Sequence, residues 1–576
     1  MKMLRRNNEY EQRTIHDWDV LVSDDRYEMS IWNNFRTEIL EQVNENAFSP
    51  LYSDNMGRPN TPVNIIVTLL VIKETFDWSF RELKDMISFH SGVLYACGCG
   101  AGDIPVTIRT MTNFIQKLRI YKEETGIDLF NEEFNRLVNG QIRRLGLRTK
   151  IARTDSTYFN TNVSSYNRLQ FLIEIVKRVY RILEEKDKQQ FASLFHSYAD
   201  YDADNYVYNL RGSDIDEEFR KIGHCYYSLQ KLFSDKYSNE KSWQLYLRVF
   251  KEQFTVTDEE QIELKPSEEM TSSSIRGVDD PEATLRHKSG ENYLGYVGNI
   301  VETADPDNEI NLICDADLCQ NNTSDEQMLV DSFDELKEKK LPDLNEIHFD
   351  AGYGGKALDE KLDKHEVKGV QTGIRGVKTD CRMDVTREND TYCAICPAGE
   401  KVQLEQTKKG YKAEFTKTKC SSCKYLTKCP VKYMKRSDAY AYYIREEDLP
   451  RRLRLTNIKT IPEKRKTLRS GVESTVWQFK CRTKMGKTRL RGHFRHKIWF
   501  LLTALAINVR RIYQYTTGTP KNGKSLGSPS LSQTFCHFQR QIASFFNNFL
   551  LKIVKNTRIF GPYEFSEVQT LKTLWN

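Results

Sequence analysis

The chain lacks any long apolar segment. No apolar run reaches the roughly 18 residues that a helix needs to span a bilayer. The first residues, MKMLRRNNEYEQR, also lack the apolar stretch and small-residue cleavage site that export requires. We therefore expect a soluble, cytoplasmic protein with no membrane partner. A glycine-rich phosphate loop followed by Lys-Ser or Lys-Thr is absent too, so ATP use is not indicated.

Thirteen cysteines in a reducing cytoplasm are expected to remain free of disulfides. Five of them form the cluster Cys393-x2-Cys396-Pro and Cys420-x2-Cys423-x5-Cys429, a spacing typical of a structural zinc site. A tetrahedral ion takes only four ligands. We expect Cys396, Cys420, Cys423 and Cys429, because Cys396 precedes a Pro-Ala-Gly turn, with Cys393 as the substitute fourth ligand. Free buried thiols are the alternative.

Positive charge is concentrated in one part of the chain. The net charge of all 576 residues is only +6, but residues 401–511 hold 30 Lys and Arg against 8 Asp and Glu. That segment carries about +22 and the remainder about −16. Clustered cations favour a polyanionic partner, because binding releases counterions from phosphates. A solvated charged surface is the alternative.

Hydrophobic periodicity changes along the chain. Residues 28–140 carry apolar side chains at helical spacing, with breaks at GRPNTP and CGCGAGDIP. From 148 onward the pattern predicts, in order, three strands, a helix and a fourth strand: RTKIARTDSTYF, NYLGYVGNIVETAD, INLICDADL, SDEQMLVDSFDELKEK and NEIHFDAGYGG. Helical periodicity fills most of the long interval between the first two strands, which predicts a helical insertion.

These patterns predict a mixed α/β chain of several parts. Its length exceeds what one hydrophobic core usually supports. We expect an N-terminal helical, DNA-contacting domain at 1–145, a catalytic core at 146–164 and 285–385, a helical insertion and loop at 165–284, a cysteine-rich zinc ribbon at 386–440, a basic continuation of the core at 441–516, and a linker and tail at 517–576.

Three acidic residues stand in settings that favour metal chemistry. Both aspartates are expected to end short β-type runs: Asp155 follows the alternating run RTKIAR, and Asp350 ends EIHFD before a glycine-rich turn in which little side-chain bulk would hinder DNA or a metal. Glu473 lies in a basic helix. Two Mg²⁺ ions held by carboxylates can activate both oxygens of a phosphodiester displacement. Singly, each aspartate is more often a cap or turn residue, and three further carboxylates around the third strand are alternatives to Asp350: Asp315, Asp317 and Asp325.

The glutamate helix is expected to begin at Pro462. Arg469, Glu473, Trp477 and Lys480 then fall on one helical face, so that the carboxylate reaches the metals while the two cations bind phosphates. The alternative for Arg469 and Glu473 is an ion pair on the protein surface. The alternative for Trp477 is packing in the core.

Three motifs together carry a resemblance to a known family. RTDST, DAGYGG and R-x3-E-x6-K resemble the catalytic motifs of bacterial insertion-sequence transposases of the DDE class, although Lys466 stands where the family usually has tyrosine. The strand order is similar to that of the ribonuclease H-like fold. The resemblance covers roughly residues 28–515. It implies that Asp155, Asp350 and Glu473 bind two Mg²⁺ or Mn²⁺ ions.

The resemblance implies a transposase that cleaves an insertion sequence at its ends and joins it to target DNA. Double-stranded DNA, as terminal inverted repeats and target, would be the partner, and a homodimer or larger assembly on DNA is expected in the bacterial cytoplasm. The residues expected to contact DNA are Arg469, Trp477, Lys480, Lys484, Arg489 and Arg491. A nuclease that cuts without joining and a non-catalytic DNA-binding remnant are the alternatives.

Overall fold

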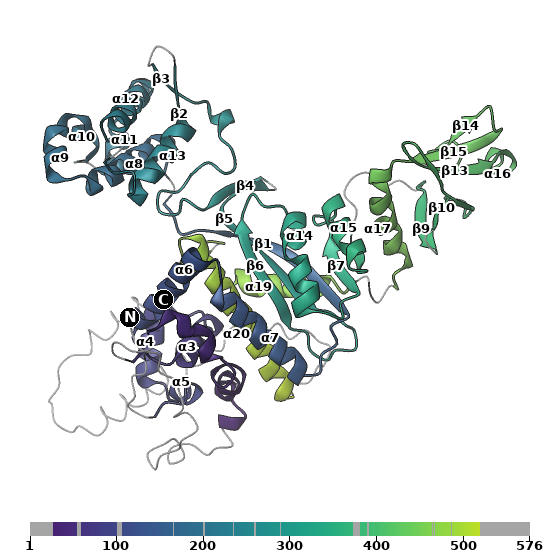
Figure 1. Cartoon of the computed structure of the whole chain (residues 1–576), viewed down its shortest axis with the longest axis horizontal. Helices are drawn as coiled ribbons and strands as arrows, with labels where there is room; N and C mark the ends of the chain where they lie inside the picture. The colour runs from purple at the N-terminus through teal and green to yellow at the C-terminus, as the bar shows by residue number, and fades with distance from the viewer. Residues whose placement is uncertain are drawn as a thin grey trace, which may run out of the picture. The chain divides into compact units, whose positions relative to one another are not determined.

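The computed structural model has a mixed α/β fold with several separate sheets (Figure 1). It describes residues 27–518 except for the gaps 54–58, 101–105, 165, 200–201, 234–235, 258–260, 289, 373–380, 389–390, 463–464, 466 and 485. Most of the expected linker and tail therefore lies outside the described residues, as does Lys466.

The N-terminal region is helical. Its elements are α2 (Ile31–Phe35), η2 (Arg36–Leu40), η3 (Glu45–Leu51), α3 (Val63–Thr75), α4 (Phe80–Phe89), α5 (Ser91–Ala96), α6 (Ile108–Thr125) and α7 (Leu129–Arg144). Helix α3 is buried along almost its whole length. The apolar run continues past it, but Asp77 has a positive φ of 52° and Ser79 begins α4 with a capping box to Glu82, so the run forms two helices.

The central sheet gathers strands from distant parts of the chain. Its strands are β1 (Ile151–Asn160), β4 (Thr284–Lys288), β5 (Glu291–Thr303), β6 (Ile313–Gln320), β7 (Glu346–Asp350) and β8 (Lys368–Thr372). Strand β5 pairs antiparallel with β1 on one side, and with β4 and then β6 on the other. Strands β1, β7 and β8 run parallel. The three strands, helix and fourth strand predicted from sequence are confirmed.

Two helices accompany the parallel half of the sheet. Helix α14 (Asp325–Glu335) continues as η6 (Leu336–Lys340) between β6 and β7, and α15 (Lys356–Lys364) connects β7 to β8. The two helices contact each other. Each parallel connection thus passes through a helix, as parallel strands require.

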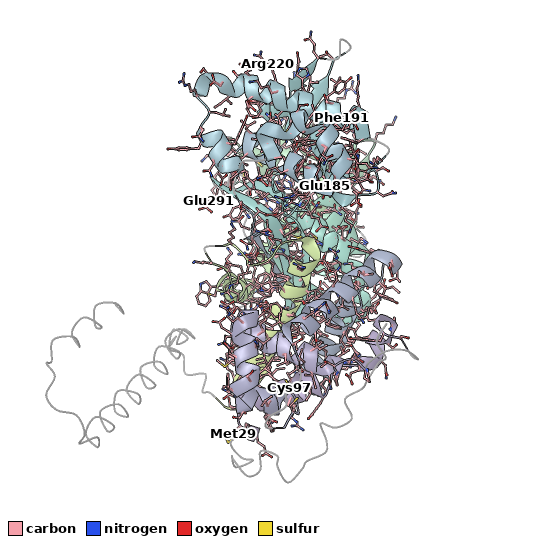
Figure 2. The ribbon with its side chains drawn as sticks, turned by 90° about the vertical axis from the view of Figure 1, so that its left-hand side faces the viewer. Met29, Cys97, Glu185, Phe191, Arg220 and Glu291 are labelled. Carbon is pink, nitrogen blue, oxygen red and sulfur yellow. The ribbon has the colours of Figure 1, made fainter. Side chains whose placement is uncertain are left out.

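The insertion between β1 and β4 has its own hydrophobic core. Its elements are α8 (Arg168–Ile182), α9 (Glu185–Gln190), α10 (Ala192–Ala199), α11 (Ala203–Tyr208), η4 (Gly212–Asp214), α12 (Ile215–Phe233), α13 (Lys241–Gln253), β2 (Phe254–Val256), β3 (Ile262–Leu264) and η5 (Ser267–Glu269). Figure 2 labels Glu185, Phe191 and Arg220 among these helices. The expected helices are confirmed. The short β2–β3 hairpin and strand β4 were not predicted.

The cysteine-rich segment forms two small antiparallel sheets. One contains β9 (Asp384–Glu388), β10 (Thr391–Ile395) and β11 (Lys401–Gln403). The other contains β12 (Glu405–Thr407), β13 (Gly410–Thr416), β14 (Lys432–Met434) and β15 (Ala439–Ile444). Helix α16 (Lys417–Ser421) connects β13 to β14 in the second sheet, and η7 (Glu446–Asp448) leads into α17 (Leu449–Thr460). Helix α17 contacts both β9 and β8, so it joins the small sheets to the central one.

The last helix of the described residues, α20 (His493–Thr516), is buried between two layers. It contacts β6 of the central sheet on one side and α3 of the N-terminal helices on the other (Figure 1). Gly298 permits this approach, because a Cβ there would lie 2.4 Å from the Phe500 ring. One hydrophobic cluster consequently joins the N-terminal helices, α20 and the sheet. Among the described residues, no helix combines the length and apolar character that a membrane crossing needs.

Candidate active site

Asp155 and Asp350 lie at the same level on neighbouring parallel strands. The pairing of β1 with β7 ends with Arg153 opposite His348. Asp155 and Asp350 each follow two residues later on their strands, so their side chains are on the face of Arg153 and His348, and Asp350 acts on the charge of Asp155. Asp350 ends its strand as predicted, but Asp155 is the fifth of ten residues in β1, so the expectation that it ends a strand is wrong. Strand pairing on β5 extends β1 beyond it.

Arg469 brings Glu473 to this pair of aspartates. Its guanidinium donates to Asp155 Oδ2 at 2.9 Å and to Glu473 Oε1 at 3.1 Å. Glu473 lies in the first turn of α19 (Ser470–Lys480). The helix begins at Ser470 rather than at Pro462, so Arg469 precedes it as the N-cap residue. Arg469 and Glu473 therefore form the ion pair that was expected as the alternative to metal chemistry. Arg469 also contacts Asp155, so it bridges the two acids.

The electrostatic setting of Asp155 disfavours its charge in the absence of a cation. Burial raises the pKa of Asp155 and outweighs the lowering by Arg469 and by the Ser156 backbone N–H, while Asp350 raises it further. The Glu473 side chain is 61% exposed and that of Asp155 only 13%. The part of the site on β1 is therefore buried, and the part on α19 is exposed to solvent.

A buried carboxylate fixes α19 against the sheet. Glu302 is fully buried, and it accepts from Arg153 Nε at 2.8 Å, Thr475 Oγ1 at 3.0 Å and Arg511 at 2.7 Å. Arg153 also donates to the carbonyl of Leu468, the residue before Arg469. This network, the Glu302 clamp, connects β1, β5, α19 and α20. Sequence reasoning missed it, because its members are up to 358 positions apart.

Gly471 is required by the Glu302 clamp. A Cβ at this position would lie 2.0 Å from the Arg153 guanidinium. The first turn of α19 therefore packs directly on Arg153, two residues before Glu473. No sequence signal distinguished this glycine, since it follows no turn or strand pattern.

Asp325 is the one alternative carboxylate that lies beside the site. It accepts from Ser156 Oγ at 2.8 Å, and Ser156 follows Asp155 directly. The other two alternatives are held in ion pairs elsewhere: Asp315 with Lys340 at 2.7 Å and Asp317 with Lys497 at 3.1 Å. The geometry therefore favours Asp350 over both as a partner of Asp155.

The glycines after Asp350 make room for the chain's own side chains. A Cβ on Gly355 would overlap the Glu326 carboxylate, which accepts from the first backbone N–H groups of α15. A Cβ on Gly354 would lie 2.7 Å from Gln371 and 3.0 Å from Arg454. Gly354 and Gly355 therefore admit a buried arginine and a helix cap. A cavity also borders both glycines and Ala351, so the expected approach of DNA or a metal here stays a prediction.

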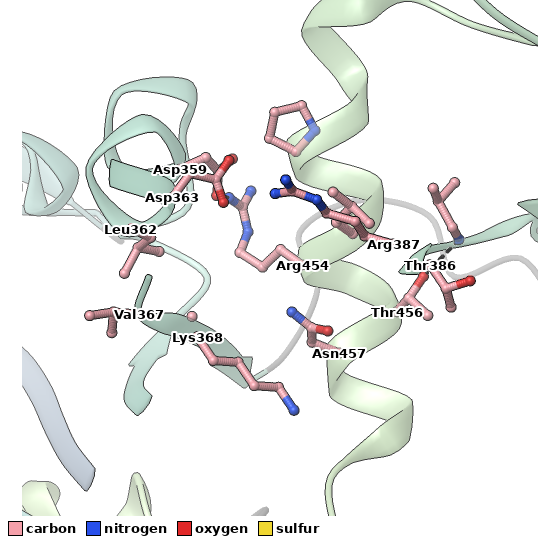
Figure 3. Close-up of a pocket in the computed structure, with 14 residues that line it drawn as sticks. Asp359, Leu362, Asp363, Val367, Lys368, Thr386, Arg387, Arg454, Thr456 and Asn457 are labelled. Atoms are coloured by element: carbon pink, nitrogen blue, oxygen red, sulfur yellow. Dashed lines mark hydrogen bonds and ion pairs between the residues drawn. The ribbon is translucent and has the colours of Figure 1, made fainter. Parts of the chain in front are cut away.

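Arg454 of α17 joins the cysteine-rich side to α15. It is buried, donates from Nε to Gln371 at 2.7 Å, and forms an ion pair with Asp359. Figure 3 shows its side chain extending from α17 towards Asp359, beside a cavity of about 310 Å³. A second cavity of about 300 Å³ lies on the Gly354 side of the same arginine. The arginine thus separates the two hollows.

The residues expected to contact DNA divide into two groups. Trp477, Lys480 and Lys484 are exposed, and the 59% exposure of Trp477 makes core packing wrong for this side chain. Arg489 instead contacts Asp77, with an ion-pair distance of 3.6 Å, and Arg491 pairs with Asp279 at 3.2 Å. The open face of α19 is therefore the better-placed part of the expected DNA surface.

Four of the cysteines line one small apolar cavity of about 20 Å³: Cys396, Cys420, Cys423 and Cys429. Cys393 pairs with Gln403 and Thr386 within its sheet and does not line it. Burial raises the pKa of the Cys429 thiol to about 11, with further raising by Cys381. Cys381 is a nearby thiol that sequence spacing did not indicate. The four cysteines that line the cavity are those expected as zinc ligands, and zinc binding stays a prediction.

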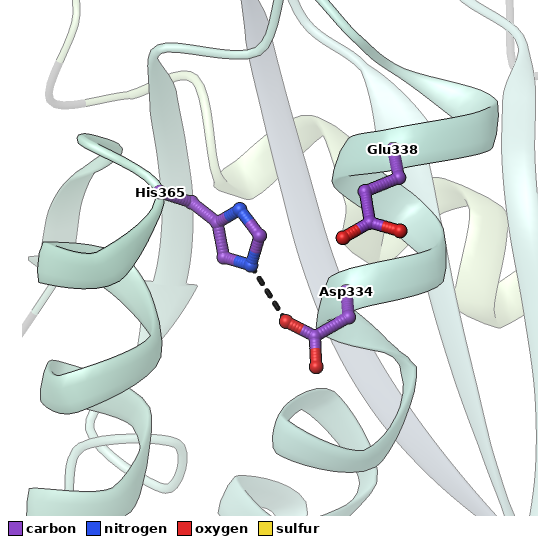
Figure 4. A group of neighbouring side chains, drawn as sticks. All are labelled: Asp334, Glu338 and His365. Atoms are coloured by element: carbon purple, nitrogen blue, oxygen red, sulfur yellow. Dashed lines mark hydrogen bonds and ion pairs between the residues drawn. The ribbon is translucent and has the colours of Figure 1, made fainter.

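In the described part of the chain, one group of three ligand residues has all its donor atoms within 4.8 Å of one another, and it lies outside this site. It consists of Asp334, Glu338 and His365 (Figure 4). Asp334 already pairs with Lys361, with Lys364 at 3.2 Å and with His365 at 2.6 Å. These contacts lower its pKa. Cations of the chain therefore already satisfy the carboxylate.

Two protein-family models match the chain. One, described as "Transposase DDE domain", matches residues 395–513, which include the cysteine cavity, Arg469 and Glu473. The other, described as "Transposase domain (DUF772)", matches residues 25–117 in the N-terminal helices. Neither range includes Asp155 or Asp350. No curated protein and no solved structure matched.

Both descriptions are of transposase domains, and they match separate parts of the chain: the N-terminal helices and the segment that carries Arg469 and Glu473. Transposases act on DNA, and those of the DDE class generally use divalent metal ions. The two matches support an insertion-sequence DDE transposase.

Proposed function

We propose that the protein is a DDE transposase that cleaves DNA at the ends of an insertion sequence and joins the freed ends to target DNA. The observation that carries this proposal is the contact of Arg469 with both Asp155 and Glu473, beside Asp350. These acids come from three segments far apart in the chain. Carboxylates gathered in this way, next to an exposed face with cations, suit a phosphodiester substrate.

The proposed catalytic core has a ribonuclease H-like fold. The sheet order β6-β5-β1-β7-β8, with β5 antiparallel to both neighbours and β1, β7 and β8 parallel, supports this assignment. So does the position of the acids, with one in the first strand of the core and one at the end of the fourth.

Asp155, Asp350 and Glu473 would hold two Mg²⁺ or Mn²⁺ ions. Carboxylate oxygens are the donors that these ions prefer, and two of the three acids already share one guanidinium, so the donor set fits a divalent cation. When bound, such ions stabilise the charge on the attacking and leaving oxygens. Residues of α19 and of the turn after it would position the DNA, with Lys480 and Lys484 on phosphates and Trp477 against a base.

The partner proposed is double-stranded DNA, as terminal inverted repeats and as target, bound by a dimer or larger assembly. The net charge of about +22 over residues 401–511 supports it. Arg489 and Arg491 remain half exposed beside their acidic partners and could add phosphate contacts at the edge of this surface. A structural Zn²⁺ held by Cys396, Cys420, Cys423 and Cys429 would fix the two small sheets.

The test uses purified protein, Mg²⁺ or Mn²⁺, and labelled duplexes that carry the inverted repeats flanking the coding region. We expect nicked and joined products, and their loss in Asp155→Asn, Asp350→Asn and Glu473→Gln with DNA binding retained. Cleavage without joined product would support a nuclease. DNA binding without any metal-dependent product would support a non-catalytic remnant.

A further inference from the structure

Arg469 occupies the space between two of the proposed metal ligands. One terminal nitrogen is 2.9 Å from Asp155 Oδ2 and the other 3.1 Å from Glu473 Oε1. The side chain of Arg469 is 21% exposed, so the bridge is only partly shielded from water. A planar guanidinium with two parallel donors suits this bridging role, which an ammonium cannot reproduce.

The bridge leaves Arg469 incompletely satisfied. Its Nε is buried and has no hydrogen-bond partner among the described residues. The acids are not drawn close together either, because the proposed ligands do not form a group with all donor atoms within 4.8 Å. A divalent ion between the two carboxylates would lie at shorter range from their oxygens, roughly 2.0–2.1 Å for Mg²⁺. The guanidinium and an ion therefore cannot both lie between these carboxylates.

We propose that Arg469 is an internal cation that closes the metal site of the DNA-free protein and has to leave it before the ions bind. This inference rests on the proposed function. It makes Arg469 a positioning residue: it holds the acids in place while the site is empty, and competes with the ions that replace it. The backbone need not move, since Arg153 holds the Leu468 carbonyl and only the Arg469 side chain must swing.

A phosphate of bound DNA is the group suited to receive the released guanidinium. Arginine binds phosphate in the same bidentate way as carboxylate. Arg469 is next to α19, whose exposed residues Trp477 and Lys480 lie on the proposed DNA surface. DNA binding would thus favour metal loading, and metal binding would favour DNA by the same factor.

The first experiment measures Mn²⁺ binding to the full-length protein without DNA, by isothermal titration calorimetry. We expect Arg469→Gln to bind Mn²⁺ at least about fivefold more tightly than wild type, the lower end of common coupling factors. The matched control is Lys480→Gln, which removes the same charge from the same segment but is not part of the bridge between the two acids; we expect less than half of that effect. Equal or weaker binding in Arg469→Gln overturns the inference.

Arg469→Lys separates charge from geometry. Lysine keeps the positive charge but lacks the fork that spans two carboxylates. We expect its Mn²⁺ affinity to fall between wild type and Arg469→Gln, and an affinity equal to that of wild type would show that charge alone matters and overturn the bridging role. Thermal unfolding of each variant, followed by circular dichroism, verifies that the fold is intact before affinities are compared.

Two further variants distinguish this inference from the proposed function. If Asp155→Asn and Glu473→Gln leave Mn²⁺ binding unchanged, the acids are not the ligands and the proposed function fails. If those variants lose Mn²⁺ while Arg469→Gln binds it as wild type does, only the inference about Arg469 fails.

A second experiment follows the guanidinium to DNA. The affinity for an uncleaved duplex is measured at several salt concentrations, with and without Ca²⁺, for wild type and Arg469→Gln. With the ion present, we expect the plot of log affinity against log salt to be steeper for wild type than for Arg469→Gln. The expected difference is about one unit, the slope of one phosphate contact. Without the ion, the two slopes should agree. If the slopes of wild type and Arg469→Gln differ by the same amount with and without Ca²⁺, the metal does not release Arg469 and the inference is overturned.

Discussion

Two clusters of acids and cations lie on different helices of the core, and they differ in depth. The Asp155–Arg469–Glu473 bridge sits over a buried strand and is held from below by the Glu302 clamp. In the Asp334 cluster the ligand atoms lie closer together, yet two lysines and a histidine already contact its carboxylate. The proposed metal site is thus the one where a single guanidinium has to leave, and not the one where the ligand atoms lie closest.

The comparison predicts, first, a large difference in activity. Asp155→Asn should reduce metal-dependent DNA cleavage by more than the roughly 10- to 100-fold that loss of an outer-shell partner costs, because a direct ligand is removed. Asp334→Asn should leave cleavage within about twofold, since surface substitutions away from the site change little. Gel assays of labelled duplex measure both. Comparable losses in the two variants would make the second cluster functional.

We also expect Glu302→Gln to destabilise the protein more than Asp334→Asn does. Glu302→Gln leaves Arg153 and Arg511 without their shared charge in a buried network, which should lower the free energy of unfolding by about 3–5 kcal/mol. Asp334→Asn removes ion pairs at the surface, so its effect should be smaller. Urea denaturation of both variants against wild type provides the values. An equal loss would mean that the clamp is no better buried than the surface cluster.

The two aspartates should also give opposite dependences on pH. Burial raises the pKa of Asp155, so its ionisation opposes folding as the pH rises above about 3.8. The pKa of Asp334 is lowered by Lys361, His365 and Lys364, so it contributes stability that is present above about pH 4 and lost as the pH falls further.

Unfolding measured from pH 3 to 7 tests these signs. Relative to wild type, Asp155→Asn should gain stability with rising pH, whereas Asp334→Asn should lose it. A gain in Asp334→Asn, or no pH-dependent change in Asp155→Asn, contradicts the assignment of buried and surface roles.

The smallest expected effect concerns two exposed lysines. Lys480→Gln should weaken duplex binding similarly for all sequences and lower the salt slope by about 0.9, the value for one phosphate contact. Lys364, which pairs with Asp334, serves as the comparison, and Lys364→Gln should leave the slope unchanged. Fluorescence anisotropy across a salt series measures both slopes. A reduced slope in Lys364→Gln would extend the proposed DNA surface to α15.

Much of the core could be predicted from sequence, because its strands and α14 show clear periodicity. The positions and contacts of individual side chains could not be predicted in this way. Asp155 was expected at a strand end because the alternation stops there, whereas pairing with β5 continues the strand through five polar or aromatic residues. Proline at 462 suggested a helix start that tertiary contacts place at Ser470.

The acids themselves were found through their local motifs, but the contacts that unite them are long-range. Arg469 is 314 residues from Asp155, and Arg153 is 149 from Glu302. No local pattern encodes such pairs. The glycines after Asp350 show the same limit: their small size is visible in the sequence, but the side chains of Glu326 and Arg454 that fill the space are not.

The burial of α20 on both faces has a practical consequence for dissecting the protein. A fragment that starts after residue 145 would lose the α3 side of this helix and present a strip of leucine, isoleucine and phenylalanine to water. Such a fragment should aggregate unless the missing helices are supplied as a separate polypeptide. Complementation by two co-expressed pieces is therefore a sounder strategy than truncation.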